Sequence, residues 1–290
     1  MTPLNHPAPP TVHTIAEVRA AVAAARRGGH AIGFVPTMGA LHAGHISLVD
    51  AAKQRCGFVV VSIFVNPTQF GPHEDYDQYP RTLAADQRML ASAATDLVFA
   101  PSAAEVYPAG HCTYVDLTEV TDTWEGAHRP GHFRGVATVV LKLFNMVQPD
   151  MAFFGQKDYQ QSLVIRRLVQ DLNLPLQIQV CPTLRDPDGL AMSSRNAYLS
   201  TQERQQALVL SRALRHAENA VRGGTVRADR LRAELLELFA AEPAVKLEYL
   251  AIVDPDTLAS VELVSGDTLF ALAARVGKTR LIDNALISAR

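Results

Sequence analysis

The sequence is poor in cysteine, and no two cysteines are spaced for a metal site or a disulfide framework. Cys56, Cys112 and Cys181 stand far apart and form no CxxC pair. An odd number of isolated cysteines is typical of a reducing compartment and argues against a zinc ribbon or a stapled secreted domain. All three lie in or beside apolar runs, so we expect buried, unreactive thiols.

Long apolar runs and a secretory leader are also missing. No segment approaches the about 20 consecutive apolar residues that span a bilayer. Residues 1–12 are rich in proline and polar side chains and lack the cationic and apolar regions of a signal peptide. We therefore expect a frayed N-terminal leader and a cytoplasmic protein without a membrane partner.

Charge of one sign is not in excess either. The 290 residues carry a formal net charge of -2 and a pI of about 6.5, so the chain lacks the basic footprint of a nucleic-acid-binding protein. Hydrophobic residues make up 48% and charged residues 19%, which excludes a disordered chain and supplies a sizeable core. The length indicates about two domains.

In the N-terminal part of the chain, short apolar runs alternate with segments of helical periodicity. We expect strands at residues 31–35, 58–65, 97–100, 151–154 and 176–180. We expect helices at residues 14–27, 46–55, 83–93, 135–147 and 160–171. Strands that alternate with helices are typical of βαβ units and predict an α/β domain with a Rossmann-like parallel sheet.

The pattern changes near residues 181–185. Two long amphipathic helices are expected at residues 202–222 and 227–241, followed by strands at 245–253, 268–274 and 279–284. A helical pair followed by strands predicts a smaller α+β domain. We therefore expect a Rossmann-like domain over residues 1–183 and a smaller α+β domain over residues 184–290.

Loops at the carboxyl ends of parallel strands are the expected ligand sites of such a sheet. After the first predicted strand, residues 36–45 read PTMGALHAGH and place His42 and His45 at a helix start. The N–H groups and dipole of that helix, with two imidazoles, suit phosphate oxygens or proton transfer to a leaving phosphate. The same residues fit a plain helix cap. A zinc site would need further ligands, and no cluster follows at short spacing.

A second candidate segment is the polar stretch RDPDGLAMSSRN at residues 185–196, which we expect to be a mobile loop. It could wrap a polyphosphate, with Arg195 stabilising the charge that develops on phosphorus and on leaving pyrophosphate. It also fits a surface turn followed by a serine cap.

Two more segments leave predicted strands. Residues 153–161 read FFGQKDYQQ, in which Lys157 offers charge and Asp158 suits a ribose hydroxyl or a metal. Residues 64–70 read FVNPTQF, in which Asn66 and Gln69 are uncharged amides suited to a small polar substrate. Each segment also fits an ordinary strand-end loop.

Together these segments are far more specific than any one of them. The HxGH motif and the serine-rich basic loop resemble the class I nucleotidylyltransferase superfamily. The strings PTMGALHAGH, FVNPTQF, GHFRGVATVV, FFGQKDYQQ and DGLAMSSRN, in this order and spacing, closely resemble the pantoate–β-alanine ligase family. The resemblance runs from about residue 14 through residue 283 and includes the division into two domains.

The resemblance implies a reaction in two steps. ATP and (R)-pantoate give an enzyme-bound pantoyl adenylate and pyrophosphate, and the amine of β-alanine then attacks the acyl carbonyl to give pantothenate and AMP. It implies ATP as a substrate with Mg²⁺, no organic prosthetic group, and a cytoplasmic homodimer. The first domain would bind nucleotide and pantoate, and the second would act as a lid that keeps water from the adenylate.

The resemblance also implies roles at matching positions. His45 is expected to be the phosphate-contacting proton donor, with His42, Lys157 and Arg195 as the other catalytic residues. The ATP site is expected to comprise Met38, Gly39, Ala40, Leu41, His42, Ala43, Gly44, His45, Gly155, Gln156, Lys157, Asp158, Leu184, Met192, Ser193, Ser194 and Arg195. Leu184 stands where the family usually has valine. Pantoate and β-alanine are expected to contact Gln69, Gln161, Asn66, Val139 and Val140, although the two valines fit a helix core equally well.

One position departs from the family pattern. Asp86 follows Ala85, where some relatives carry adjacent acidic residues that help to hold magnesium. We therefore assign no protein ligand to the metal, because ATP phosphates and water can supply most of its shell.

Two other function classes stay open. A nucleotidylyltransferase that acts on a phosphate ester would favour extra Arg or Lys in the acceptor pocket, whereas Gln69 and Gln161 suit a less charged substrate. A non-catalytic nucleotide-binding protein is expected to lack the HxGH histidines or Lys157, which are all present.

Overall fold

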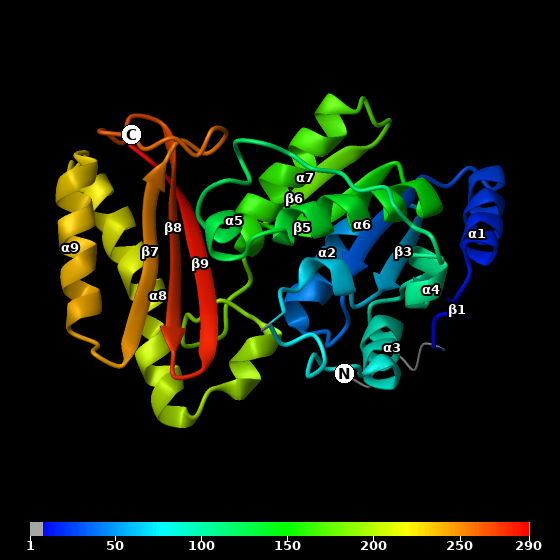
Figure 1. Cartoon of the computed structure of the whole chain (residues 1–290), viewed down its shortest axis with the longest axis horizontal. Helices are drawn as coiled ribbons and strands as arrows, with labels where there is room; N and C mark the ends of the chain where they lie inside the picture. The colour runs from blue at the N-terminus through cyan, green and yellow to red at the C-terminus, as the bar shows by residue number, and fades with distance from the viewer. Residues whose placement is uncertain (1–7, 73, 290) are drawn as a thin grey trace. The chain divides into compact units, whose positions relative to one another are not determined.

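The computed structural model describes residues 8–72 and 74–289, and the chain divides into two compact units (Figure 1). The first unit comprises the described part of Met1–Gly155 together with Gln160–Pro182. The second comprises Gln156–Tyr159 and the described part of Thr183–Arg290. No sequence pattern indicated that the short segment Gln156–Tyr159 belongs to the second unit.

A parallel sheet forms the centre of the first unit. Its strands are β1 (Thr11–Val12), β2 (Ile32–Thr37), β3 (Phe58–Ile63), β4 (Leu97–Phe99), β5 (Met151–Gly155) and β6 (Gln177–Cys181). The order is β1-β4-β3-β2-β5-β6 and every pair is parallel. The expected Rossmann-like sheet is confirmed. The chain runs outward from β2 through β3 to β4, and from β5 to β6 in the other direction. The strand order therefore reverses between β2 and β5, which is the switch point where such sheets bind ligands.

Helices cover both faces of this sheet. The helices of this unit are α1 (Ile15–Arg27), α2 (Ala43–Lys53), α3 (Leu83–Ser92), α4 (Ala103–Val106), α5 (Glu125–His128), α6 (His132–Val147) and α7 (Tyr159–Asp171). Neighbouring residues of one strand enter different cores: Phe34 packs with side chains of α1 and α6, and Val35 with side chains of α2. Burial on both faces explains why the strands read as continuous apolar runs rather than as alternating ones.

The expectation of a frayed leader is wrong for residues 10–12. The Val98 N–H donates to Pro10 O at 2.9 Å, and the Ala100 N–H donates to Val12 O at 2.9 Å. These bonds place β1 at the edge of the sheet beside β4. A strand of two residues is too short to produce a readable periodicity. The part of the expectation that concerns residues 1–7 lies outside the described residues.

The second unit has the expected helical pair and strands of an α+β domain, and the structure shows that the strands form an antiparallel sheet. Strands β7 (Val245–Val253), β8 (Asp267–Val276) and β9 (Thr279–Ser288) pair in sequence order. Helices α8 (Thr201–Arg222) and α9 (Ala228–Ala240) supply Leu210 and Leu231 to a core that also holds Phe270 of β8. A capping box between Ser200 and Glu203 begins α8.

The expected burial of the cysteines holds for two of the three. Cys56 and Cys181 are buried, and burial raises the pKa of each thiol. Cys112 is exposed, so the expectation is wrong there. It lies in the irregular segment after Tyr107, where apolar neighbours in the sequence do not correspond to a packed strand. In the part of the chain that the structure describes, no helix has the length and apolar character needed to cross a membrane.

A glycine allows α6 to pack directly on the turn that follows β3. That turn is the 3₁₀ helix η1 (Pro67–Gln69). A Cβ atom at Gly135 would lie 2.3 Å from Thr68 O and 2.7 Å from the Cα of Gln69. The Asn66 side chain also donates from Nδ2 to Gly135 O at 3.2 Å. Helix and turn are therefore joined by a backbone contact that only glycine permits.

Replacing Gly135 by Ala is expected to lower the free energy of unfolding by about 1–3 kcal/mol, because the methyl group must displace backbone atoms. The higher helix propensity of alanine opposes this cost only in part. Chemical denaturation measures the effect. Gly266→Ala is the matched control, because a Cβ atom there meets nothing within 4 Å. Equal stability of the two variants would contradict the packing.

Candidate active site

The loop between β2 and α2 adopts a left-handed backbone at two consecutive residues. Gly39 has φ +81° and Ala40 has φ 50°. A Cβ atom at position 39 would lie 3.0 Å from Asp86 Oδ2 and 3.1 Å from Ile63 Cγ2. Both the dihedral and the close approach call for glycine there. The loop thus brings its backbone directly against α3 and the end of β3.

Asp86 holds this loop in place. Its carboxylate accepts the backbone N–H groups of Ala40 at 3.1 Å and Leu41 at 2.9 Å, and the Thr82 hydroxyl donates to both oxygens at 3.2 Å. Asp86 is 2% exposed. A buried carboxylate saturated in this way acts as an anchor for the loop backbone. Sequence reasoning considered Asp86 for magnesium only; nothing in the sequence indicated its contacts with the loop.

The two motif histidines cap the helix that follows the loop. His42 is the N-cap of α2 and accepts the Gly44 N–H at Nδ1 at 3.1 Å. His45 accepts the His42 N–H at Nδ1 at 3.3 Å, and the ring centroids lie 4.1 Å apart. The helix-cap interpretation is therefore confirmed. Because each Nδ1 accepts a backbone proton, the hydrogen-bond network assigns the neutral rings as Nε2–H tautomers. The cap orients two ring N–H donors at the positive end of a helix.

Asn66 and Gln69 lie at the end of β3, as expected, and they contact each other. Asn66 is 1% exposed and donates from Nδ2 to Gln69 Oε1 at 3.0 Å. That bond fixes the Gln69 amide, whose Nε2 lies 3.2 Å from the sulfur of Met38. The structure therefore brings a candidate substrate residue, Gln69, against the loop of candidate ATP residues.

A charged network that sequence reasoning missed supports the backbone of Gln69. His132 Nδ1 donates to Gln69 O at 2.9 Å, and its Nε2 lies 3.0 Å from Arg129 Nη1. Arg129 also pairs with Glu74 through Nη2 and Oε2 at 2.6 Å. Burial, and then the charge of Arg129, lower the pKa of His132 to about 4. Burial raises the pKa of Glu74, but its hydrogen bond and charge interaction with Arg129 outweigh burial and the net pKa is lowered. The string GHFRG contains His132, yet its spacing gave no sign of this role.

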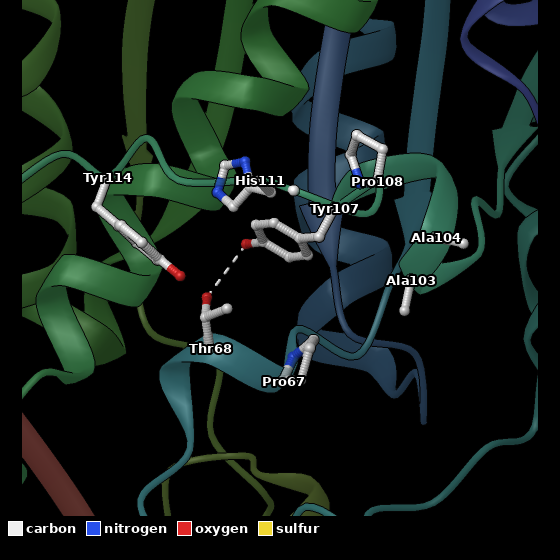
Figure 2. A pocket seen from close by; sticks show the side chains of 9 residues that line it. Pro67, Thr68, Ala103, Ala104, Tyr107, Pro108, His111 and Tyr114 are labelled. Carbon is white, nitrogen blue, oxygen red and sulfur yellow. Dashed lines mark hydrogen bonds between the residues drawn. The ribbon is translucent and has the colours of Figure 1, made fainter.

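Behind η1, an open hollow of about 370 Å³ is lined by aromatic rings (Figure 2). Figure 2 shows Tyr107, His111 and Tyr114 along its wall, with the hydrogen bond of 3.1 Å between the hydroxyls of Thr68 and Tyr107. The Tyr107 hydroxyl also donates to Asn66 Oδ1 at 2.8 Å. Tyr107 therefore helps to hold the Asn66 side-chain amide, which in turn orients Gln69.

The remaining candidates of the first unit take separate positions. Val139 and Val140 lie on α6 and are each 5% exposed in the core beside the sheet. Gln161 lies in the first turn of α7 and is partly exposed. Gly155 is the last residue of β5, at the carboxyl end of a strand that borders the switch point. The helix-core interpretation of the two valines is confirmed, and their contact with a substrate stays a prediction.

In the second unit, candidate ATP residues lie in two irregular segments. Gln156, Lys157 and Asp158 form the 3₁₀ turn η2 (Gln156–Asp158). Ser193 caps η3 (Ser194–Tyr198) by accepting the Arg195 N–H at 3.2 Å. The serine-cap interpretation is therefore confirmed.

A hairpin precedes η3. Arg185 pairs with Ala191 as an isolated bridge, and the Met192 N–H donates to Leu184 O at 3.0 Å. Leu184 is 40% exposed. Within the stretch expected to be a polar loop, residues 185–192 thus belong to a hydrogen-bonded hairpin, and Ser193 leads into η3. Its mobility stays a prediction.

Fold and site together define a Rossmann-like α/β protein with a candidate site at the carboxyl ends of its parallel strands. The family model of pantoate-beta-alanine ligase matches residues 10–286. The chain therefore belongs to the pantoate–β-alanine ligase family.

Individual relatives agree with this assignment. The pantothenate synthetase of Pelotomaculum thermopropionicum is 54% identical over 275 residues, covering 95% of this chain and 98% of that protein. The crystal structure of pantothenate synthetase from Thermus thermophilus matches with a TM-score of 0.91 at 48% identity, covering 96% and 99% of the two chains. The crystal structure of pantoate-beta-alanine ligase from Francisella tularensis, complexed with beta-gamma ATP and beta-alanine, matches with a TM-score of 0.80 at 37% identity, covering 96% and 98%.

The low pKa of His132 makes stability dependent on pH. The folded state has a pKa of about 4 against an ordinary value of 6.5, so the unfolded chain binds this proton more readily. The stabilisation is present above the ordinary pKa and is lost as the pH falls toward about 4. Between about pH 7 and about pH 5, we expect this group to remove about 2 kcal/mol of the free energy of unfolding.

His132→Gln keeps an amide able to donate to Gln69 O and should lose that pH-dependent component. Urea unfolding at both pH values measures it. Identical pH dependence in His132→Gln and wild type would contradict the assignment.

Proposed function

We propose that the chain catalyses the ATP-dependent condensation of (R)-pantoate with β-alanine to pantothenate through a pantoyl adenylate, releasing pyrophosphate and AMP. The observation that carries the proposal is the contact between Gln69 and Met38, which joins an uncharged amide to the histidine-bearing loop. Membership of the pantoate–β-alanine ligase family supports it, as does the relative complexed with beta-gamma ATP and beta-alanine.

The first step brings two anions together. A carboxylate oxygen of pantoate attacks the α-phosphorus, a new P–O bond forms, and pyrophosphate leaves with the electrons of the broken P–O bond. The Nε2–H groups of His42 and His45 and the start of α2 suit the phosphate oxygens, since they place donors and positive potential where negative charge gathers. Lys157 and Arg195 are proposed to add positive charge at the triphosphate. As the proton donor of this assignment, His45 offers its Nε2–H to a phosphate oxygen as a hydrogen bond, because its Nδ1 accepts the His42 N–H.

The second step needs an amine held beside an activated acyl group. The nitrogen of β-alanine attacks the acyl carbon, the C–O bond to AMP breaks, and the nitrogen loses a proton. Positioning supplies most of the rate in such a step. No protein nucleophile takes part, in keeping with the buried thiols of Cys56 and Cys181 and their raised pKa values.

The remaining residue assignments belong to the same proposal. ATP is proposed to contact residues 38–45, 155–158, 184 and 192–195, and the two substrates to contact Gln69, Gln161, Asn66, Val139 and Val140. The family resemblance supports these positions. It also supports a homodimer in the cytoplasm, with residues 1–183 binding nucleotide and pantoate and residues 184–290 acting as a lid.

Magnesium is proposed to enter as MgATP. Within residues 8–72 and 74–289, no group of three or more His, Cys, Asp or Glu side chains is placed to hold a metal ion. Asp86 has both carboxylate oxygens engaged by the loop and Thr82. These residues do not fit a protein cage for the ion, whose ligands would be phosphate oxygens and water.

The decisive experiment measures pyrophosphate release from MgATP and pantoate on the purified chain, with and without β-alanine. A burst of about one pyrophosphate per active site is expected with pantoate alone, because the adenylate stays bound. β-Alanine should convert the burst into sustained formation of AMP and pantothenate. A folded chain that binds ATP but releases no pyrophosphate with pantoate would overturn the proposal.

Two substitutions are expected to separate the phosphate role from the substrate role. His45→Ala should slow pyrophosphate release by about 100-fold or more, since a donor to developing charge is lost. Gln69→Ala should raise the KM for pantoate by about tenfold and change the KM for ATP by less than about twofold. Steady-state kinetics with each substrate varied measure the split, and circular dichroism controls for folding. Near-normal turnover in His45→Ala, or an unchanged pantoate KM in Gln69→Ala, would reject the corresponding role.

A further inference from the structure

Strand β9 carries two adjacent buried polar residues that its role in the sheet does not require. Asp283 is 2% exposed and Asn284 is 4% exposed. Leu281 and Ile287 of the same strand pack in the core with α8 and α9. Because side chains alternate along a strand, Asp283 shares that helix-covered face and Asn284 lies on the opposite one.

The Asn284 side chain holds the turn η2. Its Nδ2 donates to Gln156 O at 2.9 Å and to Lys157 O at 2.8 Å. Both protons of one amide are therefore used on consecutive carbonyls of an irregular segment that has no ladder partner for them. This turn carries Lys157 and Asp158, two of the residues proposed to contact ATP.

The Asp283 side chain holds the hairpin before η3. Its carboxylate forms two hydrogen bonds with Arg185, Nη1 to Oδ2 at 2.6 Å and Nη2 to Oδ1 at 2.9 Å. Arg185 Nη1 also donates to Gly189 O at 3.2 Å, across the tight turn of the hairpin. A planar fork paired with a buried carboxylate fixes orientation as well as distance.

A second arginine secures the same hairpin from α8. Arg204 pairs with Asp186 at 2.7 Å and with Asp188 at 2.8 Å. The hairpin is thus tied on two sides, and residues 192–195, proposed to contact ATP, follow directly from it.

We propose that Asp283 and Asn284 form one anchor that positions both ATP-binding segments of the second unit, η2 and residues 192–195. The inference rests on the proposed function. Adjacent residues of one hydrogen-bonded strand cannot move apart, so the two segments keep a fixed spacing through β9. Buried polar groups and ion pairs add little net stability compared with apolar packing. Their use here is to set the backbone geometry of groups that bind phosphate.

The test is Asn284→Asp in the full-length chain. The substitution preserves the shape of the side chain but replaces an amide donor with a carboxylate that repels both carbonyl oxygens. We expect the KM for ATP to rise by about tenfold, the effect of losing a hydrogen bond that positions a binding group. The KM values for pantoate and β-alanine should stay within about twofold of wild type. A purely structural role would lower the melting temperature without this split.

The matched control is Glu248→Gln on β7. Glu248 pairs with Arg275 of β8 at 3.2 Å and with Arg280 of β9 at 2.6 Å, so it ties the same three strands without touching either ATP segment. It should lower the melting temperature and leave the KM for ATP unchanged. Asn284→Ala, which removes both donors without adding a negative charge beside the carbonyls, should raise the KM for ATP by less than Asn284→Asp does.

The outcomes separate this inference from the proposed function. A wild-type chain that forms no pantothenate overturns the proposed function itself. An active wild type with an unchanged KM for ATP in a folded Asn284→Asp variant overturns the anchor alone. If Asn284→Asp does not fold, Asn284→Ala provides the same comparison, and an unchanged KM for ATP there is equally decisive.

Discussion

The carboxylate of Asp86 is the constraint on which the candidate site of the first unit depends. It accepts two consecutive N–H groups from a loop whose residues 39 and 40 hold a left-handed backbone. That conformation costs energy at Ala40 and persists only where the surroundings fix it. The loop conformation in turn determines where α2 begins and how His42 and His45 cap it. It also places Met38 against Gln69.

Hydrogen bonding in this unit also decides which nitrogens carry protons. His42 and His45 use Nδ1 as an acceptor, so their protons lie on Nε2. His132 has the opposite tautomer, because its Nδ1 donates to Gln69 O and its Nε2 faces Arg129. Three histidines near one site therefore have distinct roles: two present donors where phosphate is proposed to bind, and one remains neutral in the support of Gln69.

Much of the fold could be predicted from the sequence, because burial on both faces gives the strands of a parallel sheet an unmistakable apolar pattern. Strand β7 has the expected bounds, and most other elements differ by a few residues at their ends. The edge strand β1 and the short helices α4 and α5 have too few residues to show a hydrophobic periodicity in the sequence, so they were not predicted. The motif segments were noticed because glycine, histidine and lysine cluster at strand ends, and the roles of their residues came from the resemblance to a known family. Sequence patterns did not reveal the anchoring residues, because their hydrogen-bond partners lie far away in the chain. These residues are Asp86, His132, Asp283 and Asn284.

The difference between motif residues, which the sequence reveals, and anchoring residues, which it does not, has a physical origin. Binding segments at strand ends are irregular, so their backbone N–H and C=O groups lack ladder partners and must find others. In the first unit a buried acceptor, Asp86, meets N–H groups of the loop; in the second a buried donor, Asn284, meets carbonyls of η2. In each case the side chain supplies the hydrogen-bonding partner that the backbone lacks: an acceptor for N–H groups and a donor for carbonyl groups. Residues that bind a ligand can thus be recognised by motif, whereas residues that hold them must be recognised by the backbone they satisfy, which only the folded structure displays.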